Sequence, residues 1–398
     1  MATTTAPLAQ RTTDLVGSII DSSTALLAGQ THDIVKFAMG APGDDLVPVE
    51  LFDRYYGEPM PGKYGYCETE GDPALVEQVV ALMATQGDRV TITTGGMQGL
   101  DLACKLFVDP GDLVIVEGPT YTNGNATALS YGAQLVEAPL DDAGLVVERL
   151  PELVERIGRT PKAIYTIPTF QNPSGVTLSG PRRTQLIELA ERWGCVIIDD
   201  DPYGLLRFAG ADVPTFAHLA PHHPLVFSVR TFSKILAPGL RVGWVDADPA
   251  LRQLLINAKQ AMDTCTSLPT QTMVTRFLAN GHLDAHLSRI RSLYRVRKDA
   301  MLSSLRRHFG DQVRSTDPDG GFFLWLTFTG TYAGIDTRDL AELALRRGVA
   351  YIPGPAFSTR GSFTDSLRLC FATSTPERID EGVARLKRAA DELTGGSR

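Results

Sequence analysis

The stretch that decides the fold is residues 228–244, which read SVRTFSKILAPGLRVGW. An apolar run leads into the polar turn 231–234, and a Pro-Gly bend then precedes Arg241 and a second apolar run. Hydroxyls and two cations between buried strands favour a site that binds an anion and presents the amine of Lys234. A partly desolvated lysine beside another cation has a lowered pKa and attacks carbonyl groups. Taken alone, Ser233–Lys234 is more simply a surface lysine after a strand, so the rest of the chain must decide.

The composition predicts a globular protein from inside the cell. The chain of 398 residues has room for two to three domains, and 43% hydrophobic with 21% charged residues is typical of globular proteins. A net charge of -8 argues against a nucleic-acid partner. The five cysteines form no CxxC pair and no zinc spacing, so we expect reduced thiols and no metal. Neither a signal peptide nor a membrane-length apolar run is recognised, which predicts a cytoplasmic location and no membrane partner.

Strands and helices alternate from about residue 72 to residue 245. Short continuous apolar runs in this region are typical of strands that helices cover on both faces. The segments between them are amphipathic; Leu100–Phe107 and Leu186–Trp193 carry apolar residues at helical spacing. This pattern predicts a mostly parallel α/β sheet. The seven expected strands are 89–93, 113–116, 133–136, 163–167, 195–199, 225–229 and 242–245.

The two ends of the chain differ from this alternating region. Residues 1–35 form a polar arm in which the amphipathic patch 15–27 predicts a short helix. After about residue 270 the pattern predicts a smaller α+β domain packed after the sheet. Its expected elements are a long helix over 276–309, a strand in 320–326, a helix over 337–347, a strand over 367–371 and a last helix after Pro376.

Polar or glycine-rich loops follow several of the expected strands. Glycines in Thr94–Gly99 expose backbone N–H groups at a helix N-terminus, which favours an anion site, although a tight β–α turn explains the same residues. Tyr121 follows the next strand, where open α/β sheets bind ligands, and core packing is its alternative. The loop that contains Asn172–Gly175 is ordinary turn chemistry when it is considered alone.

Three adjacent carboxylates, Asp199–Asp201, directly follow an apolar run and precede Tyr203. Such groups repel one another unless a cation, a metal or a protonated ring meets them. A shared metal is disfavoured because adjacent side chains project in different directions and no histidine is near. Arg368 stands between apolar residues of a late strand, and a buried arginine usually has a carboxylate partner from the protein or from a ligand.

The order of these features resembles the fold-type I pyridoxal-phosphate enzymes, the aspartate-aminotransferase superfamily. The chain is most similar to the class I/II aminotransferases of the 2-aminoadipate and MocR-like subgroup, through QNPSGVTLS, DDPYGLLRF, TFSKILAPGLRVGW and GGFFLWL. The resemblance extends from Phe37 to Arg368. It implies a mostly parallel seven-stranded sheet covered by helices, plus a smaller α+β domain. It also implies an arm, 1–45, that joins the small domain, a large cofactor-binding domain, 46–282, and a small domain, 283–398.

The resemblance assigns roles around pyridoxal 5'-phosphate. It implies that Lys234 bonds the cofactor and moves the substrate α-proton, and that Asp200 pairs with the ring nitrogen so that the ring accepts electrons. Tyr203 and Asn172 would bond the ring hydroxyl oxygen, and Tyr121 would stack on the ring. The residues implied to hold the phosphate are Gly96, Met97, Gln98, Thr231, Ser233 and Arg241.

The same resemblance implies how substrate and partner meet the site. Arg368, with Asn172 and the backbone of Gly40, would clamp the substrate α-carboxylate. Tyr66 matches a tyrosine that reaches the phosphate of the other subunit, which implies a homodimer with a shared active site. The chain departs from its relatives at Met97, where they usually place Ser or Thr, and at Thr231, where Ser is more common.

The leading hypothesis is an aminotransferase that exchanges the amino group of an L-α-amino acid with a 2-oxo acid. An alternative is elimination, decarboxylation or oxygen-dependent oxidation of an amino acid, which Met97 and the polar run 122–125 favour. A third is a ligand sensor, against which stands the lack of a basic helix-turn-helix segment. The acidic-substrate arginine of relatives has no clear counterpart, and Arg11 is the candidate for it.

Overall fold

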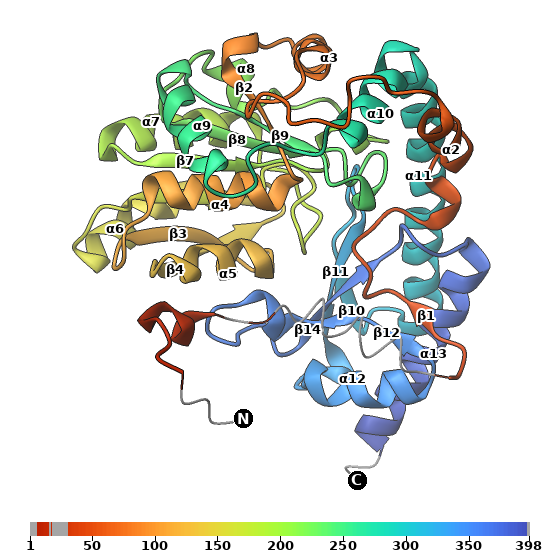
Figure 1. Ribbon diagram of the computed structural model, residues 1–398. Helices are drawn as coiled ribbons and strands as arrows, with labels where there is room; N and C mark the ends of the chain where they lie inside the picture. The colour runs from red at the N-terminus through yellow and green to blue at the C-terminus, as the bar shows by residue number, and fades with distance from the viewer. Residues whose placement is uncertain (1–5, 16, 18–30, 396–398) are drawn as a thin grey trace.

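The computed structural model describes residues 6–15, 17 and 31–395 (Figure 1). A mainly parallel sheet with its helices forms one part of the molecule, and a smaller sheet lies beside it. The helix expected over 15–27 lies outside the described residues apart from Leu15 and Gly17, and the arm before it contains a single 3-10 turn, Gln10–Asp14. All five cysteines are free thiols.

The large sheet contains all seven expected strands and one more. The additional strand, β5, has only two residues and pairs antiparallel with the end of β4. It is too short to contain an apolar run that would predict it. The strand β9 also runs antiparallel, between β2 and β8, and the remaining neighbours are parallel. In sheet order the strands are β2 (Val90–Thr93), β9 (Gly243–Asp246), β8 (Val226–Thr231), β7 (Val196–Asp200), β6 (Ala163–Thr166), β3 (Leu113–Gly118), β4 (Gln134–Asp141) and β5 (Gly144–Leu145).

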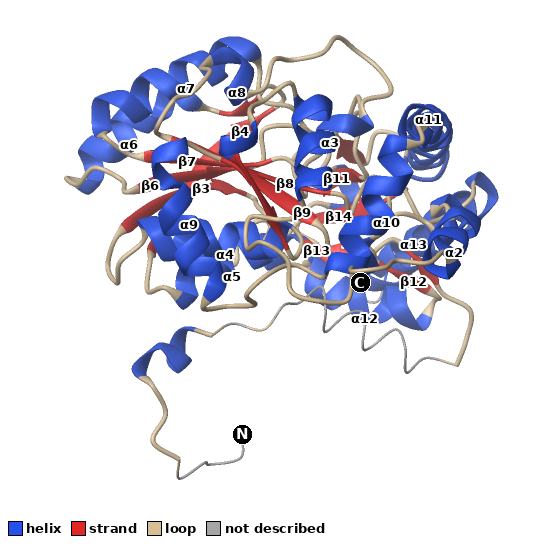
Figure 2. Ribbon diagram, turned by 45° about the horizontal axis from the view of Figure 1, so that its top comes forward, coloured by secondary structure: helices blue, strands red, loops and turns tan. Residues whose placement is uncertain are grey.

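The central strands are buried on both faces because alternate residues enter two different hydrophobic clusters. Ile115, Ile164 and Ile197 pack in one cluster, whereas Tyr165 and Ile198 point to the other. Helices cover each face (Figure 2). One face carries α6 (Leu150–Ile157), α7 (Gly180–Trp193) and α8 (Phe216–Leu219), and the other carries α4 (Gly96–Phe107), α5 (Thr122–Ser130) and α9 (Arg252–Gln260).

The long helix expected over 276–309 is two helices. The first, α10 (Leu268–Ala279), ends before Gly281, whose positive φ of 72° interrupts the helical backbone, and α11 (His282–Phe309) begins at the next residue. The expectation of one helix from residue 276 is therefore wrong at its start, because the backbone of Gly281 separates α10 from α11. Within the described residues no helix combines the length and apolarity needed to cross a membrane.

The smaller sheet has four strands, and α11 runs past it and past the large sheet (Figure 1). A separate parallel pair joins the N-terminal segment to this part of the chain, and the backbone N–H of Cys370 donates to the Phe37 carbonyl at 2.9 Å. The remaining helices are α2 (Val49–Gly57), α3 (Pro73–Met83), α12 (Thr337–Arg346) and α13 (Pro376–Gly395). The small-sheet strands are β10 (Val313–Ser315), β11 (Phe323–Phe328), β14 (Ser366–Cys370) and β13 (Ile352–Pro353), and the pair is β1 (Val35–Lys36) with β12 (Val349–Ala350).

Candidate active site

A cavity of about 280 Å³ lies at the carboxyl ends of the parallel strands, between the large sheet and β11 and β14 of the small one. Ligands bind at this edge of open α/β sheets. Of the residues singled out from the sequence, all but Gln98, Tyr66 and Arg11 line it. Those that do are Gly40, Gly96, Met97, Tyr121, Asn172, Asp200, Tyr203, Thr231, Ser233, Lys234, Arg241 and Arg368.

Lys234 is the amine of this cavity. It lies in the turn after β8, and its Nζ donates to the carbonyl oxygen of Gly40 at 2.6 Å. No carboxylate of the described residues forms an ion pair with it. Burial, followed by the nearby positive charge of Arg368, lowers the pKa of Lys234 to about 8. A substantial fraction of the amine is therefore neutral near physiological pH, as nucleophilic attack and proton transfer require.

The three adjacent aspartates have three different environments. Asp199 pairs with Arg230 at 2.7 Å, and Asp201 accepts the backbone N–H of Gly204 at 2.7 Å. Asp200, between them, lines the cavity, and its carboxylate accepts a hydrogen bond from the Tyr165 hydroxyl at 2.8 Å. Burial raises the pKa of Asp200 to about 7, against the lowering effects of Tyr165 and Arg230. A positively charged group of a bound ligand would therefore stabilise the ionised form of this carboxylate.

Two buried residues behind Asp200 were not anticipated from the sequence. Tyr165, on β6, orients the Asp200 carboxylate, and Glu117, at the end of β3, accepts hydrogen bonds from the Thr166 hydroxyl at 2.5 Å and the Gln171 amide at 3.0 Å. Burial raises the pKa of Glu117 to about 7. Gln171 also donates to the carbonyl of Pro119 at 2.7 Å. Glu117 thus holds together the loops that carry Tyr121 and Asn172.

The glycine turn before α4 forms an anion cradle. Gly95 has a φ of 78°, and a Cβ there would lie 2.6 Å from the guanidinium of Arg241. On the other side, a Cβ on Gly243 would lie 3.0 Å from the backbone nitrogen of Gly96. The two glycines let strand β9 and Arg241 approach the first N–H groups of the helix, where an anion is stabilised. Thr231 and Ser233, whose hydroxyl groups are 2.8 Å apart, complete the cradle.

The support of this turn was also not anticipated. Thr94 donates its hydroxyl to Asp263 at 2.6 Å, and Lys259 donates to the same carboxylate at 2.6 Å. Gln98 accepts the backbone N–H of Thr94 at 2.7 Å, so its side chain braces the turn instead of entering the cavity. Asp263 and Lys259 lie far along the chain from Thr94, so the sequence gives no signal for this role.

Arg368 is fully buried on β14 and has no carboxylate partner among the described residues. Its terminal nitrogens donate to the Asn172 side chain at 2.9 Å and to the Ala38 carbonyl at 2.7 Å, while Nε has no partner. The guanidinium lies 4.2 Å from the ring centroid of Phe323. Burial lowers the pKa of Arg368. A buried guanidinium with an unused N–H is a receptor for a carboxylate.

The aromatic residues of the cavity are held by packing. Tyr203 is buried, with its ring against Phe322 and Phe323 at centroid distances of 5.4 and 5.8 Å. Tyr121 donates its hydroxyl to the Met97 sulfur at 3.7 Å, so the departure at Met97 places a thioether beside this ring. Arg11 is exposed, acts electrostatically on Tyr131, and does not line the cavity. Tyr66 is 87% exposed and also lies outside it.

One edge of the cavity is tied across to the large sheet. Glu137, on β4, accepts the hydroxyl groups of Ser358 and Thr359 at 2.9 and 2.8 Å, and also the backbone N–H of Thr359. The preceding residue, Phe357, lies against Arg368, with the guanidinium 5.2 Å from its ring centroid. The backbone N–H of Thr120 donates to the Phe357 carbonyl at 3.0 Å. These bonds keep Phe357 beside Arg368, which lines the cavity.

A primary amine, a carboxylate, an aromatic face and an anion cradle around one cavity fit a phosphorylated aromatic aldehyde, and the unpaired arginine fits an amino acid carboxylate. These are the requirements of a pyridoxal-phosphate enzyme. The sequence model of the family aminotransferase class I and II matches residues 58–386, and the chain belongs to this family. It is a pyridoxal-phosphate-dependent aminotransferase that acts on amino acids.

The similarity to individual aminotransferases extends over nearly the whole chain. The chain is 36% identical to aromatic-amino-acid aminotransferase 1 of Thermococcus litoralis, over 91% of this chain and 89% of that protein. It is 35% identical to 2-aminoadipate transaminase of Thermus thermophilus, over 92% of each. Among solved structures, the kynurenine aminotransferase of Pyrococcus horikoshii in complex with PMP has a TM-score of 0.90 at 35% identity, with 97% of both chains covered.

Proposed function

We propose that this aminotransferase exchanges the amino group of an L-α-amino acid with a 2-oxo acid. The observation that carries the proposal is Arg368: a fully buried guanidinium without a carboxylate partner, next to Asn172 and close to Lys234. Amino acids and 2-oxo acids both carry the carboxylate that this group lacks, so one receptor serves both halves of the exchange. A Cβ at Gly40 would lie 3.8 Å from Arg368 Nη1, so the absence of a side chain leaves room there.

The other residues of the cavity would bind the cofactor and transfer the α-proton. Pyridoxal phosphate, when bound, supplies an electron sink for negative charge that develops at the substrate α-carbon. Asp200 would hold the positive charge on the ring nitrogen, and Tyr203 and Asn172 would bond the ring hydroxyl oxygen. Tyr121 would stack on the ring, and Lys234 would accept and return the α-proton with its Nζ. The phosphate would bind at Gly96, Met97, Gln98, Thr231, Ser233 and Arg241.

The protein is proposed to act as a homodimer with a shared active site. In support, Tyr66 and Tyr64 are 87% and 78% exposed on the loop after Gly62, and large exposed aromatics in one loop are typical of interfaces. Tyr66 would then reach the phosphate of the other subunit. The proposed domains are the arm, 1–45, the large domain, 46–282, and the small domain, 283–398; the pairing of β1 with β12 supports the placement of the arm with the small domain.

The test is a panel of single L-amino acids added to the purified holoenzyme without any acceptor. Productive donors should convert the aldehyde form of the cofactor to its amine form, which absorbs at a shorter wavelength, without release of ammonia. A 2-oxo acid added afterwards should restore the first spectrum and yield the corresponding amino acid. If no donor changes the spectrum, or if ammonia appears in amounts equal to the donor consumed, the proposed exchange is wrong.

A further inference from the structure

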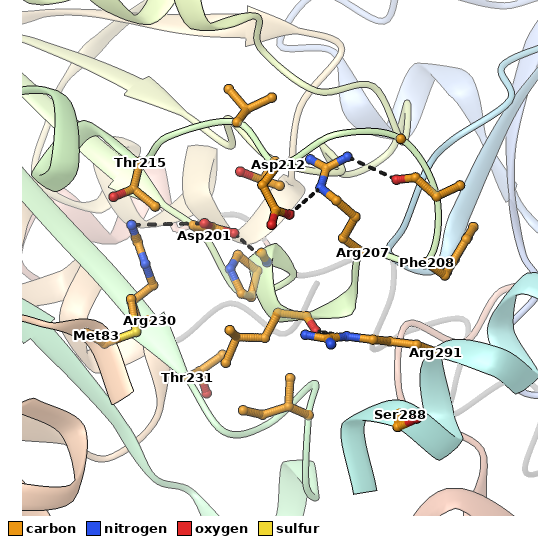
Figure 3. A pocket seen from close by; sticks show the side chains of 18 of the residues that line it. Met83, Asp201, Arg207, Phe208, Asp212, Thr215, Arg230, Thr231, Ser288 and Arg291 are labelled. Carbon is orange, nitrogen blue, oxygen red and sulfur yellow. Dashed lines mark hydrogen bonds and ion pairs between the residues drawn. The ribbon is translucent and has the colours of Figure 1, made fainter. Parts of the chain in front are cut away.

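A second cavity lies behind the strand ends that form the candidate active site. Its volume is about 690 Å³, against about 280 Å³ for the first, and Pro202 and Thr231 line both. One wall is the segment 201–215, which follows β7, and the opposite wall is α11 (Figure 3). The segments are far apart in sequence, so the cavity exists only in the folded chain.

The α11 wall presents one polar face of the helix. Ser288, Arg291, Ser292 and Arg295 follow the spacing i, i+3, i+4, i+7 and all line the cavity. Arg291 reaches across toward the loop after β7, where its Nε donates to the Leu205 carbonyl at 2.8 Å (Figure 3). Neither Arg291 nor Arg295 forms an ion pair with a carboxylate of the described residues. Two like charges one turn apart destabilise a helix unless an anion lies between them.

The opposite wall adds a third guanidinium. Arg207 is 11% exposed and stacks on Phe170 at 4.7 Å, so its position is fixed. Its Nη1 lies 3.9 Å from Asp319, whose side chain is 53% exposed, and its Nε pairs at 3.2 Å with Asp212, whose side chain is 97% exposed. Such an exposed partner contributes little and is easily displaced. Arg230 also lines this cavity, yet its charge is already met by Asp199 and Asp201.

The charge of this cavity is opposite to that of the chain. Its lining carries four arginines and two aspartates, an excess of two positive charges, in a chain of net charge -8. Hydroxyl groups stand beside these charges; they belong to Thr169, Thr215, Ser288 and Ser292, of which Ser292 already donates to the Ser288 carbonyl at 2.9 Å. Such a concentration of cations and hydroxyls suits a small ligand with several negative charges.

We propose that this second cavity binds a small polyanion, a phosphate ester or a polycarboxylate, between Arg207 on one wall and Arg291 and Arg295 on the other. The ligand would connect the large sheet, through the segment after β7, to α11, which packs on the small sheet. The backbone of Arg207 already bridges to Gly320 at the entry of the small sheet. The proposal goes beyond the proposed function and does not depend on it, since no residue that would touch the substrate is involved.

The experiment measures binding of inorganic phosphate and of citrate, each alone, to the holoenzyme by isothermal titration calorimetry. The double variant Arg291→Gln/Arg295→Gln removes the α11 charges, and Arg207→Gln removes the opposite one. We expect a dissociation constant raised by about tenfold for each charge removed. Arg306→Gln is the matched control, because Arg306 is an exposed arginine of the same helix that does not line the cavity. Arg368→Gln tests whether phosphate or citrate binds at the candidate active site instead.

The outcomes separate clearly. Weaker binding in both the double variant and Arg207→Gln, with unchanged binding in Arg306→Gln and Arg368→Gln, supports the proposal. Saturation by phosphate alone identifies a phosphate ester, and saturation by citrate alone identifies a polycarboxylate. Equal binding by wild type, the double variant and Arg207→Gln overturns the proposal, as does the absence of saturable binding of either probe or a loss confined to Arg368→Gln. Circular dichroism of each variant confirms that it is folded.

Discussion

Arg230 and Arg368 are two buried arginines whose surroundings are opposite. Arg230 lies on β8, and although burial alone would lower its pKa, Asp199 and Asp201 raise the pKa above the ordinary value. Arg368 lies on β14 among Asn172, Ala38 and Phe323, and burial lowers its pKa. The first cation is neutralised by the fold. The second has no carboxylate partner among the described residues, and we propose that it binds the substrate carboxylate.

The largest effect is expected at Lys234, another cavity cation without a carboxylate partner among the described residues. Lys234→Ala should lower the rate of the amino-donor half-reaction by about 10⁴-fold or more, because both the cofactor-bonding amine and the proton carrier are lost. Stopped-flow absorbance measures the rate. Lys234→Arg retains the positive charge but no primary amine, and it should be equally inactive. Wild-type absorbance and rate in Lys234→Ala would show that another residue bonds the cofactor.

Arg230→Met tests the matched member of the comparison. The substitution leaves Asp199 buried without its ion-pair partner, and the Ser228 hydroxyl, at 2.6 Å, still donates to it. We expect the free energy of unfolding of the cofactor-free protein to fall by about 3–5 kcal/mol, measured by urea denaturation. A loss below about 1 kcal/mol would mean that Arg230 and Arg368 do not differ in the way described.

Arg368→Gln tests the unmatched member. Without the guanidinium, kcat/KM for the amino donor should fall by roughly 10²–10³-fold, because the substrate carboxylate would lose its charged partner. The free energy of unfolding of the cofactor-free protein should stay constant or rise, the opposite of the result for Arg230→Met. Destabilisation by Arg368→Gln as large as that of Arg230→Met would remove the distinction between the two sites.

A smaller, pH-dependent effect is expected in the cofactor-free protein. Because the folded pKa of Lys234 is about 8 and its ordinary value is 10.5, the folded state binds the proton less tightly than the unfolded state. The resulting cost to stability is complete below about pH 8, up to about 3 kcal/mol, and disappears as the pH rises toward 10.5. Lys234→Met should therefore stabilise the protein most at pH 7 and progressively less toward pH 10. A stability difference that does not change with pH would contradict the lowered pKa.

The sequence was sufficient for seven of the eight strands of the large sheet and for most residues around the cavity. Buried strands are continuous apolar runs, whereas Asn172 and Lys234 were identified through the resemblance to fold-type I enzymes and not by their own loops. The strand order could not be read, because β9 enters between β2 and β8 and no local pattern records which strands pair. The break at Gly281 was missed since apolar spacing continues on both sides of it.

Residues that act from behind the cavity gave no usable signal. Tyr165 and Glu117 occupy strands, where a tyrosine and an acid are indistinguishable from core and edge residues until the partners are known. The second cavity is similar: Arg207 and Arg291 are separated by more than eighty positions, and each alone resembles a solvated surface charge. Only the fold brings them to opposite walls of one space.

The hydrogen bonds that Glu137 accepts have a kinetic consequence. Any movement that lifts Phe357 away from Arg368 must first break the bonds to Ser358 and Thr359. At about 1 kcal/mol each, three such bonds slow this opening by up to about a hundredfold. The position of Phe357 against Arg368 therefore depends in part on β4, a strand none of whose residues line the cavity.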